Sequence, residues 1–112
     1  MKTPKQDQED FVILYLDTAQ AGAVDILTQD FHEEFYQRFG GKREIYFFGS
    51  CPVQKAQRLL ADMAKRDLLD KWIIGLQGHE SGFPKWVYSY TLSEQGKSRL
   101  RVLKYQENKL GE

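Results

Sequence analysis

The chain has 112 residues, which suits one domain, and its composition of 41% hydrophobic and 29% charged residues is that of an ordinary soluble globular protein. No apolar run approaches the roughly 20 residues that cross a bilayer, so we expect no membrane partner. The formal net charge is zero, but residues 1–50 hold five basic and nine acidic side chains, whereas residues 51–112 hold eleven basic and seven acidic ones. This asymmetry hints that the second half faces a polyanion.

Residues 1–112 are expected to form a single domain, with flexible ends at residues 1–5 and 108–112. The first ten residues are polar and lack the apolar segment of a secretory signal. Cys51 is the only cysteine, which excludes an internal disulfide. Together these features predict a reducing, cytoplasmic setting.

Two helices are predicted in the first 40 residues. Over residues 5–20 the apolar side chains cover more than one stripe, which predicts a largely buried helix: Phe11, Val12, Ile13, Leu14, Tyr15 and Leu16. A break at Ala21-Gly22 precedes a second helix over residues 23–39, whose apolar residues recur at spacings of three and four: Val24, Leu27, Phe31, Phe35 and Phe39. Gly40-Gly41 is a typical helix end.

A third helix is predicted over residues 52–66, after a stretch at 42–49 that favours a short strand or an extended connection. Proline is common at the first helical position, so Pro52 behind Ser50 and Cys51 is a good start signal. The expected buried stripe consists of Val53, Ala56, Leu60, Met63 and Ala64. The first turns then present a polar outer face, formed by Gln54, Lys55, Gln57 and Arg58.

A hairpin and a last helix complete the predicted order. Residues 72–77 and 85–92 have strand character, because Trp86, Tyr88 and Tyr90 alternate with smaller residues, and the turn-rich stretch 78–84 joins them. Ser93 suits the N-cap of the last helix. That helix has Leu100, Leu103 and Tyr105 on its apolar side and is otherwise basic: Lys97, Arg99, Arg101, Lys104 and Lys109.

Two segments resemble bacterial regulators of the PadR and MarR types. AQRLLADMAKRDLLDKW, from Ala56 onwards, resembles their recognition helix and the step into their wing, with Asp67 at the position of a glycine. YSYTLSEQGKSRL, residues 88–100, resembles the end of their wing and the start of their last helix, with Ser93 for threonine and with Gly96 and Leu100 in place. The resemblance implies an α+β winged helix-turn-helix fold: a three-helix core, a two-stranded β-wing and a C-terminal helix. The connection at 42–50 is longer than the usual turn.

The same resemblance implies a dimeric, sequence-specific DNA-binding regulator, a repressor, with double-stranded DNA as its partner. The helix at 52–66 would enter the major groove, where Arg and Lys pair with guanine and Gln with adenine, and the wing at 77–86 would follow the backbone. The candidate contacts are Lys42, Arg43, Ser50, Gln54, Lys55, Gln57, Arg58, His79 and Lys85. The first and last helices would form the homodimer, with Tyr15, Leu103 and Tyr105 as candidate interface residues.

Each candidate has a plainer interpretation. The polar face of the third helix is also typical of a solvated surface, Ser50 of a helix cap, His79 of an exposed loop, and Lys42 and Arg43 of ordinary loop charges. Cys51 at a helix start has the position of a redox-sensitive thiol, although a small residue tolerated there is the simpler account.

No catalytic or cofactor site is legible in the sequence. His32-Glu33-Glu34 begins like a zinc-protease helix motif, but Tyr36 stands where the second histidine is needed. Two histidines and one cysteine far apart make no familiar metal site. We therefore expect a protein that is not an enzyme and holds neither a metal nor a cofactor.

Two other functions stay open. The first is a winged-helix module that binds proteins instead of DNA, for which the acidic side of the second helix would be the docking face. The second is a plasmid or phage accessory protein in replication or partition. Salt dependence separates protein binding from DNA binding, because contacts with phosphates weaken steeply as salt rises.

Overall fold

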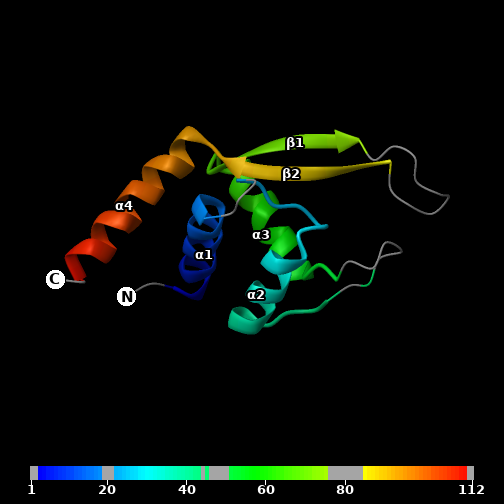
Figure 1. The fold of residues 1–112 in the computed structure, drawn as a ribbon, viewed down its shortest axis with the longest axis horizontal. Helices are drawn as coiled ribbons and strands as arrows, with labels where there is room; N and C mark the ends of the chain where they lie inside the picture. Colours follow the sequence, from blue (N-terminus) through cyan, green and yellow to red (C-terminus); the bar gives the residue numbers. More distant parts are fainter. Residues whose placement is uncertain (1–2, 19–21, 44, 46–50, 76–84, 111–112) are drawn as a thin grey trace.

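The computed structural model describes residues 3–18, 22–43, 45, 51–75 and 85–110. Over these residues the elements are α1 (Pro4–Thr18), α2 (Gln29–Phe39), α3 (Gln54–Lys65), β1 (Leu69–Gly75), β2 (Trp86–Leu92) and α4 (Glu94–Leu110). Figure 1 shows α1, α2 and α3 together on one side of the β1–β2 hairpin, with α4 leading away from the hairpin base. Within the described residues the structure has four helices and one two-stranded antiparallel sheet, which confirms the α+β part of the expected fold.

Aromatic side chains join α1 to α2. The ring of Phe11 lies at the centre of this cluster, with centroid distances of 5.7 to 6.0 Å to Tyr15, Phe31, Phe35 and Phe39. The buried apolar residues of α1 extend beyond one stripe, as predicted: Phe11, Val12, Ile13 and Leu16. The contact between α1 and α2 therefore depends on aromatic rings, and those of α2 lie on one face of the helix, as their spacing of three and four residues predicted.

The start of the predicted second helix is wrong. α2 begins at Gln29, and the segment before it is extended: Val24 exchanges two backbone hydrogen bonds with Tyr90, with N···O distances of 3.0 and 2.9 Å. The backbone N–H of Asp25 donates to Thr28 Oγ1 at 3.0 Å. Short polar side chains that bond the local backbone compete with the helix, and the free edge of β2 supplies Val24 with partners. The segment before α2 therefore lies along β2.

The first strand of the hairpin begins before the predicted range of 72–77. β1 starts at Leu69 and pairs with β2 from Leu69↔Leu92 to Gly75↔Trp86. The chain reverses between α3 and β1 because Asp67 has a φ of 65°, in the left-handed region that favours glycine. Asp67 thus holds a backbone conformation that residues with a Cβ rarely adopt.

The joint between β2 and α4 depends on Ser93 and Gly96. Ser93 Oγ accepts a hydrogen bond from the Gly96 N–H at 3.1 Å, which confirms the N-cap, and donates to the Asp67 carbonyl at 2.5 Å. A Cβ at residue 96 would lie 2.2 Å from the Leu68 carbonyl oxygen. Glycine is therefore required where the first turn of α4 meets the turn that leads into β1.

α4 packs against α1 on the side that holds the buried Leu100 and Leu103, and Lys104 pairs with Asp17 at 3.0 Å. Helices also extend into both ends that were expected to be flexible, because α1 begins at residue 4 and α4 ends at residue 110. Among the described residues, none of these helices has the length and apolar character needed to span a membrane.

Candidate nucleic-acid interface

One face of α3 is buried and the opposite face is polar. The buried residues are Ala56, Leu59, Leu60 and Met63, close to the predicted stripe. Lys55 and Arg58 are exposed, while Gln54 and Gln57 are only half-exposed. The first turn of α3 holds no acidic residue. Two of the four α3 side chains predicted to contact DNA are therefore open to solvent.

The charges along this surface are mostly basic. Lys65 is exposed on the same side of α3 as Lys55 and Arg58, and within the described residues these three cations, which we call the α3 basic face, form no ion pair. Asp62 lies among them, but it pairs with Lys5 at 3.3 Å and with Arg66 at 2.8 Å. Its negative charge is thus balanced from within the fold.

The predicted helix start is wrong by two residues. Val53 is the N-cap and Gln54 the first helical residue, so Pro52 precedes the helix. The Val53 N–H donates to His32 Nδ1 at 3.1 Å, and the Gln54 N–H donates to the Lys42 carbonyl at 2.8 Å. Two backbone donors at the start of α3 are therefore used inside the protein and do not face an anion.

The observed start of α3 also affects the predictions made for Cys51 and Ser50. Cys51 lies two residues before the N-cap and is half-buried, and its N–H is 3.4 Å from Gln29 Oε1. It does not occupy the first turn of a helix, which was the premise of the redox hypothesis. Ser50 lies outside the described residues, so its predicted phosphate contact stays a prediction.

His32 positions the start of α3. Because Nδ1 accepts the Val53 N–H, the proton of the neutral ring is on Nε2, which donates to the Asp25 carbonyl at 3.1 Å. The side chain is only 1% exposed, and this burial lowers the pKa of His32 below its ordinary value of 6.5. A neutral imidazole thus connects the segment before α2, α2 itself and the N-cap of α3.

The two predicted cations before α3 differ from each other. Arg43 pairs with Glu33 at 2.6 Å, and its guanidinium carbon lies 4.8 Å from the centroid of the Tyr36 ring. Hydrogen bonds from Gln37 and from Arg43 hold the pKa of Glu33 below its ordinary value. Lys42 is exposed and has no ion pair within the described part of the chain. Lys42 is therefore the cation that stays open to a phosphate.

The hairpin presents both charge and apolar surface. Lys85 is exposed just before β2, whereas His79 and most of the predicted 77–86 wing lie outside the described residues. Trp72 is 57% exposed and Ile73 67% exposed, and the Trp72 Nε1–H donates to Thr91 Oγ1 at 3.1 Å. The expected alternation along β2 is incomplete, because Ser89 is buried as well as Tyr90.

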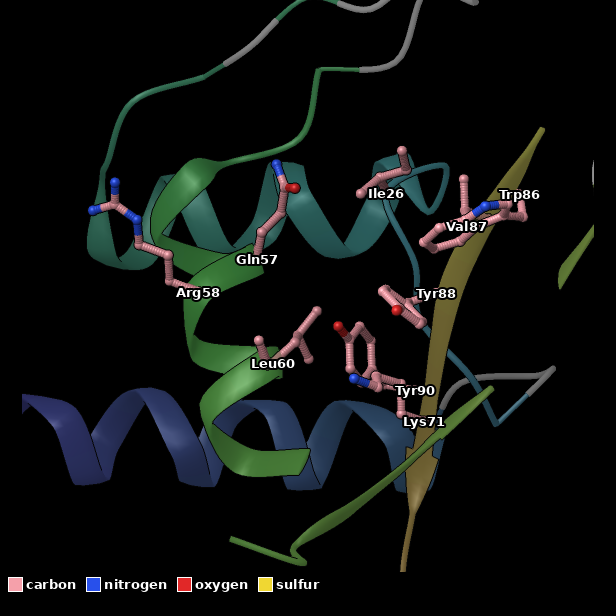
Figure 2. Close-up of a pocket in the computed structure, with 10 residues that line it drawn as sticks. Ile26, Gln57, Arg58, Leu60, Lys71, Trp86, Val87, Tyr88 and Tyr90 are labelled. Carbon is pink, nitrogen blue, oxygen red and sulfur yellow. The ribbon is translucent and has the colours of Figure 1, made fainter. Parts of the chain in front are cut away.

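A cavity of about 500 Å³ lies between α3 and β2. Its walls are mostly apolar, and Figure 2 shows Leu60 of α3 facing Tyr90 and Tyr88 of β2, with Ile26 from the segment before α2 at one end. The guanidinium of Arg58 points away from β2. Gln57 Nε2 is buried and, within the described residues, has no hydrogen-bond acceptor. Gln57 thus belongs to the cavity more than to the surface predicted to contact DNA.

Lys71 was missed by the sequence reasoning. It lies on β1 opposite Tyr90, and its Nζ is 4.4 Å from the centroid of the Tyr88 ring. Had the strand been started at Leu69, the two-residue period would have placed Lys71 on the same face as the aromatic residues.

The candidate dimer residues fall into two groups. Leu103 is buried in the core, and the Tyr15 ring lies 5.2 Å from that of Phe31 between centroids, so core packing accounts for both. Tyr105 is 67% exposed, and Val102 on the same helix is exposed as well. The side of α4 that holds Val102 and Tyr105 is therefore still open to a partner.

No protein-family model, curated protein or solved structure matches this chain. Within the residues that the structure describes, no group of three or more histidine, cysteine, aspartate or glutamate side chains is arranged to hold a metal ion.

Proposed function

We propose that this protein is a winged helix-turn-helix regulator that binds double-stranded DNA in a sequence-specific manner, acts by binding alone and works as a homodimer. α3 is the recognition helix in this proposal, and the β1–β2 hairpin is the wing. The observation that carries it is the α3 basic face, whose Lys55, Arg58 and Lys65 are without ion pairs in the described part of the chain. Lys and Arg at the start of an exposed helix suit phosphates and guanine edges.

Backbone geometry supports the family resemblance independently of charge. The left-handed φ of Asp67 occupies the glycine position of the PadR and MarR pattern. Ser93 caps α4, and Gly96 permits the close contact with Leu68. Three positions of a weak sequence pattern thus have physical reasons at the two turns that hold the hairpin on the helices.

Fluorescence anisotropy with a random pool of duplex DNA at low salt tests the proposal. Binding should weaken steeply as salt rises, and selection from the pool should yield a preferred sequence. K55A/R58A should weaken binding at least tenfold, because it removes two cations from the recognition helix. K97A/R101A removes the same charge from α4 and is the matched control. Equal loss in both double variants, or no binding by the wild type, would overturn the proposal.

A protein-interaction module is the second candidate, favoured by one observation. The hairpin exposes large apolar side chains that a purely phosphate-facing wing does not need: Trp72, Ile73, Ile74 and Trp86. In that case the protein would show no salt-dependent DNA binding, and W72R would abolish capture of its partner while K55A/R58A would not.

A further inference from the structure

One face of the hairpin is buried at its base and exposed at its far end. The pleat places three residues of β1 on this face, each opposite an aromatic residue of β2: Lys71↔Tyr90, Ile73↔Tyr88 and Gly75↔Trp86. Tyr90 is buried, whereas Ile73 is 67% exposed and Trp86 is 47% exposed. Figure 1 shows the hairpin extending past α2 and α3 in the direction away from α4. We call Ile73, Gly75 and Trp86 the distal hairpin face.

Gly75 leaves an open space beside the ring of Trp86. Side chains directly opposite each other in an antiparallel pair have Cβ atoms about 4.5–5.5 Å apart, so a side chain at residue 75 would lie against Trp86. A Cβ at residue 75 would meet no described atom within 4 Å. The rings of Trp86 and Tyr88 are 4.8 Å apart between centroids, at an angle of 69°. The space over Gly75 therefore suits a flat ring that contacts the indole.

The charge around the distal hairpin face is positive. Lys85 is exposed directly before Trp86, and Lys71 lies on the same face and forms no ion pair within the described residues. Asp70 is the only acidic residue of the two strands, and the pleat places it on the opposite face. Proteins bind single-stranded nucleic acid with aromatic rings on which bases stack, next to cations that contact the phosphates. Charge complementarity thus favours a nucleic acid strand over an apolar protein segment.

From these features we infer that the distal hairpin face binds unpaired bases of a DNA strand. A base stacks on Trp86 in the space over Gly75, and phosphates along the strand pair with Lys85 and Lys71. The inference rests on the proposed function, in which the hairpin is the wing of a DNA-binding domain. Arg58 of the α3 basic face and Trp86 border the same cavity, so a strand that separates from a duplex on α3 is within reach of the hairpin.

Fluorescence anisotropy of the full chain with two single-stranded probes tests the stacking. One probe is an oligothymidylate, and the other is a chain of abasic nucleotides with the same number of phosphates. We expect the oligothymidylate to bind at least fivefold more tightly, because a single base stacked on an aromatic ring contributes that much. W86A should reduce this preference to less than twofold. W72A, which truncates the tryptophan on the opposite face, is the matched control and should keep it.

G75V tests the same site without removing an aromatic ring. Valine favours a strand, and its Cβ would meet no described atom within 4 Å, so the hairpin should form as before. The valine side chain fills the space beside Trp86. G75V should therefore reduce the preference for oligothymidylate to less than twofold while circular dichroism stays unchanged.

Tryptophan fluorescence locates the stacked base, because the chain has two tryptophans. In W72F, whose remaining tryptophan is Trp86, oligothymidylate should quench the emission and the abasic chain should not. In W86F, whose remaining tryptophan is Trp72, neither probe should quench it.

Three results would overturn the inference: equal affinity for the two probes, an unchanged preference in W86A or G75V, or quenching in W86F but not in W72F. Each of them leaves the proposed function standing when duplex binding still depends on Lys55 and Arg58. Loss of duplex binding with the preference for oligothymidylate kept would overturn the proposed function alone.

Discussion

His32 Nδ1 accepts a hydrogen bond from the backbone N–H of Val53, the N-cap of α3, at 3.1 Å. The two residues are 21 positions apart, and the bond satisfies the backbone N–H of an N-cap residue whose own side chain makes no cap hydrogen bond. The orientation of the proposed recognition helix thus depends on a buried, neutral imidazole on α2.

This bond predicts a loss of stability in mild acid. The pKa of His32 is lowered in the folded protein, so the unfolded chain binds a proton more readily. The contribution of His32 to the free energy of unfolding is complete above the unfolded pKa of about 6.5. It is lost as the pH falls from there through the pKa of the folded protein, at up to about 1.4 kcal/mol per pH unit. Urea unfolding at pH 7.5 and 5.5 measures the change.

The matched variant for this prediction is H32Q. Glutamine does not titrate, so the drop in unfolding free energy between the two pH values should shrink, although the variant starts less stable because a buried hydrogen bond is perturbed. An equal drop in wild type and variant would show that other groups cause it. Glu33 and Asp62, whose pKa values are also lowered, titrate below this window.

Substitution of Gly96 by alanine should destabilise the fold. Alanine would normally favour a helix over glycine by about 1 kcal/mol. At residue 96, however, its Cβ would lie 2.2 Å from the Leu68 carbonyl oxygen, so α4 must shift away from the hairpin. We expect a net loss of about 2 kcal/mol or more in the unfolding free energy.

The control for G96A is Q95A, an exposed neighbour in the same helical turn, which should change the unfolding free energy by less than about 0.5 kcal/mol. If G96A were as stable as Q95A, the close contact between α4 and Leu68 would not exist in solution.

Asp67 allows a second test of the backbone, in which glycine rather than a larger residue is expected to be accommodated because of a positive φ. Its φ of 65° is unfavourable for residues with a Cβ, so D67G should be more stable than D67A by about 1 kcal/mol. Thermal or urea unfolding of the pair measures the difference. At Asp70, in extended β1, the same pair of substitutions should reverse the order, because glycine in a strand costs backbone entropy.

The proposed dimer predicts a concentration-dependent mass in sedimentation equilibrium. Among the described side chains of α4, Val102 and Tyr105 are large, apolar and exposed, so V102K/Y105K should shift the protein to monomer without changing its circular dichroism. Q95K adds a charge to the exposed N-terminal turn of α4 and should leave the dimer intact. A monomeric wild type at high concentration would contradict the prediction.

The sequence by itself determined the features that depend on neighbours along the chain. The spacing of Phe31, Phe35 and Phe39 predicted the face of α2, the glycines at 40 and 41 predicted its end, and Ser93 predicted the cap of α4. The buried and exposed sides of α3 also followed from its periodicity, because a helix repeats every 3.6 residues whatever it packs against.

Only the tertiary structure decided the features that depend on distant partners. Val24 has an apolar side chain that fits a helix stripe equally well, and the free edge of β2 makes it a bridge. In the sequence, His32 only begins a run that resembles a helix motif. In the structure it is buried and accepts a hydrogen bond from the Val53 N–H. The cavity between α3 and β2 is a further example, since Gln57, Lys71 and Tyr88 come to line one space only when the hairpin folds over α3. Contacts between residues far apart in the chain leave no periodic signal in it.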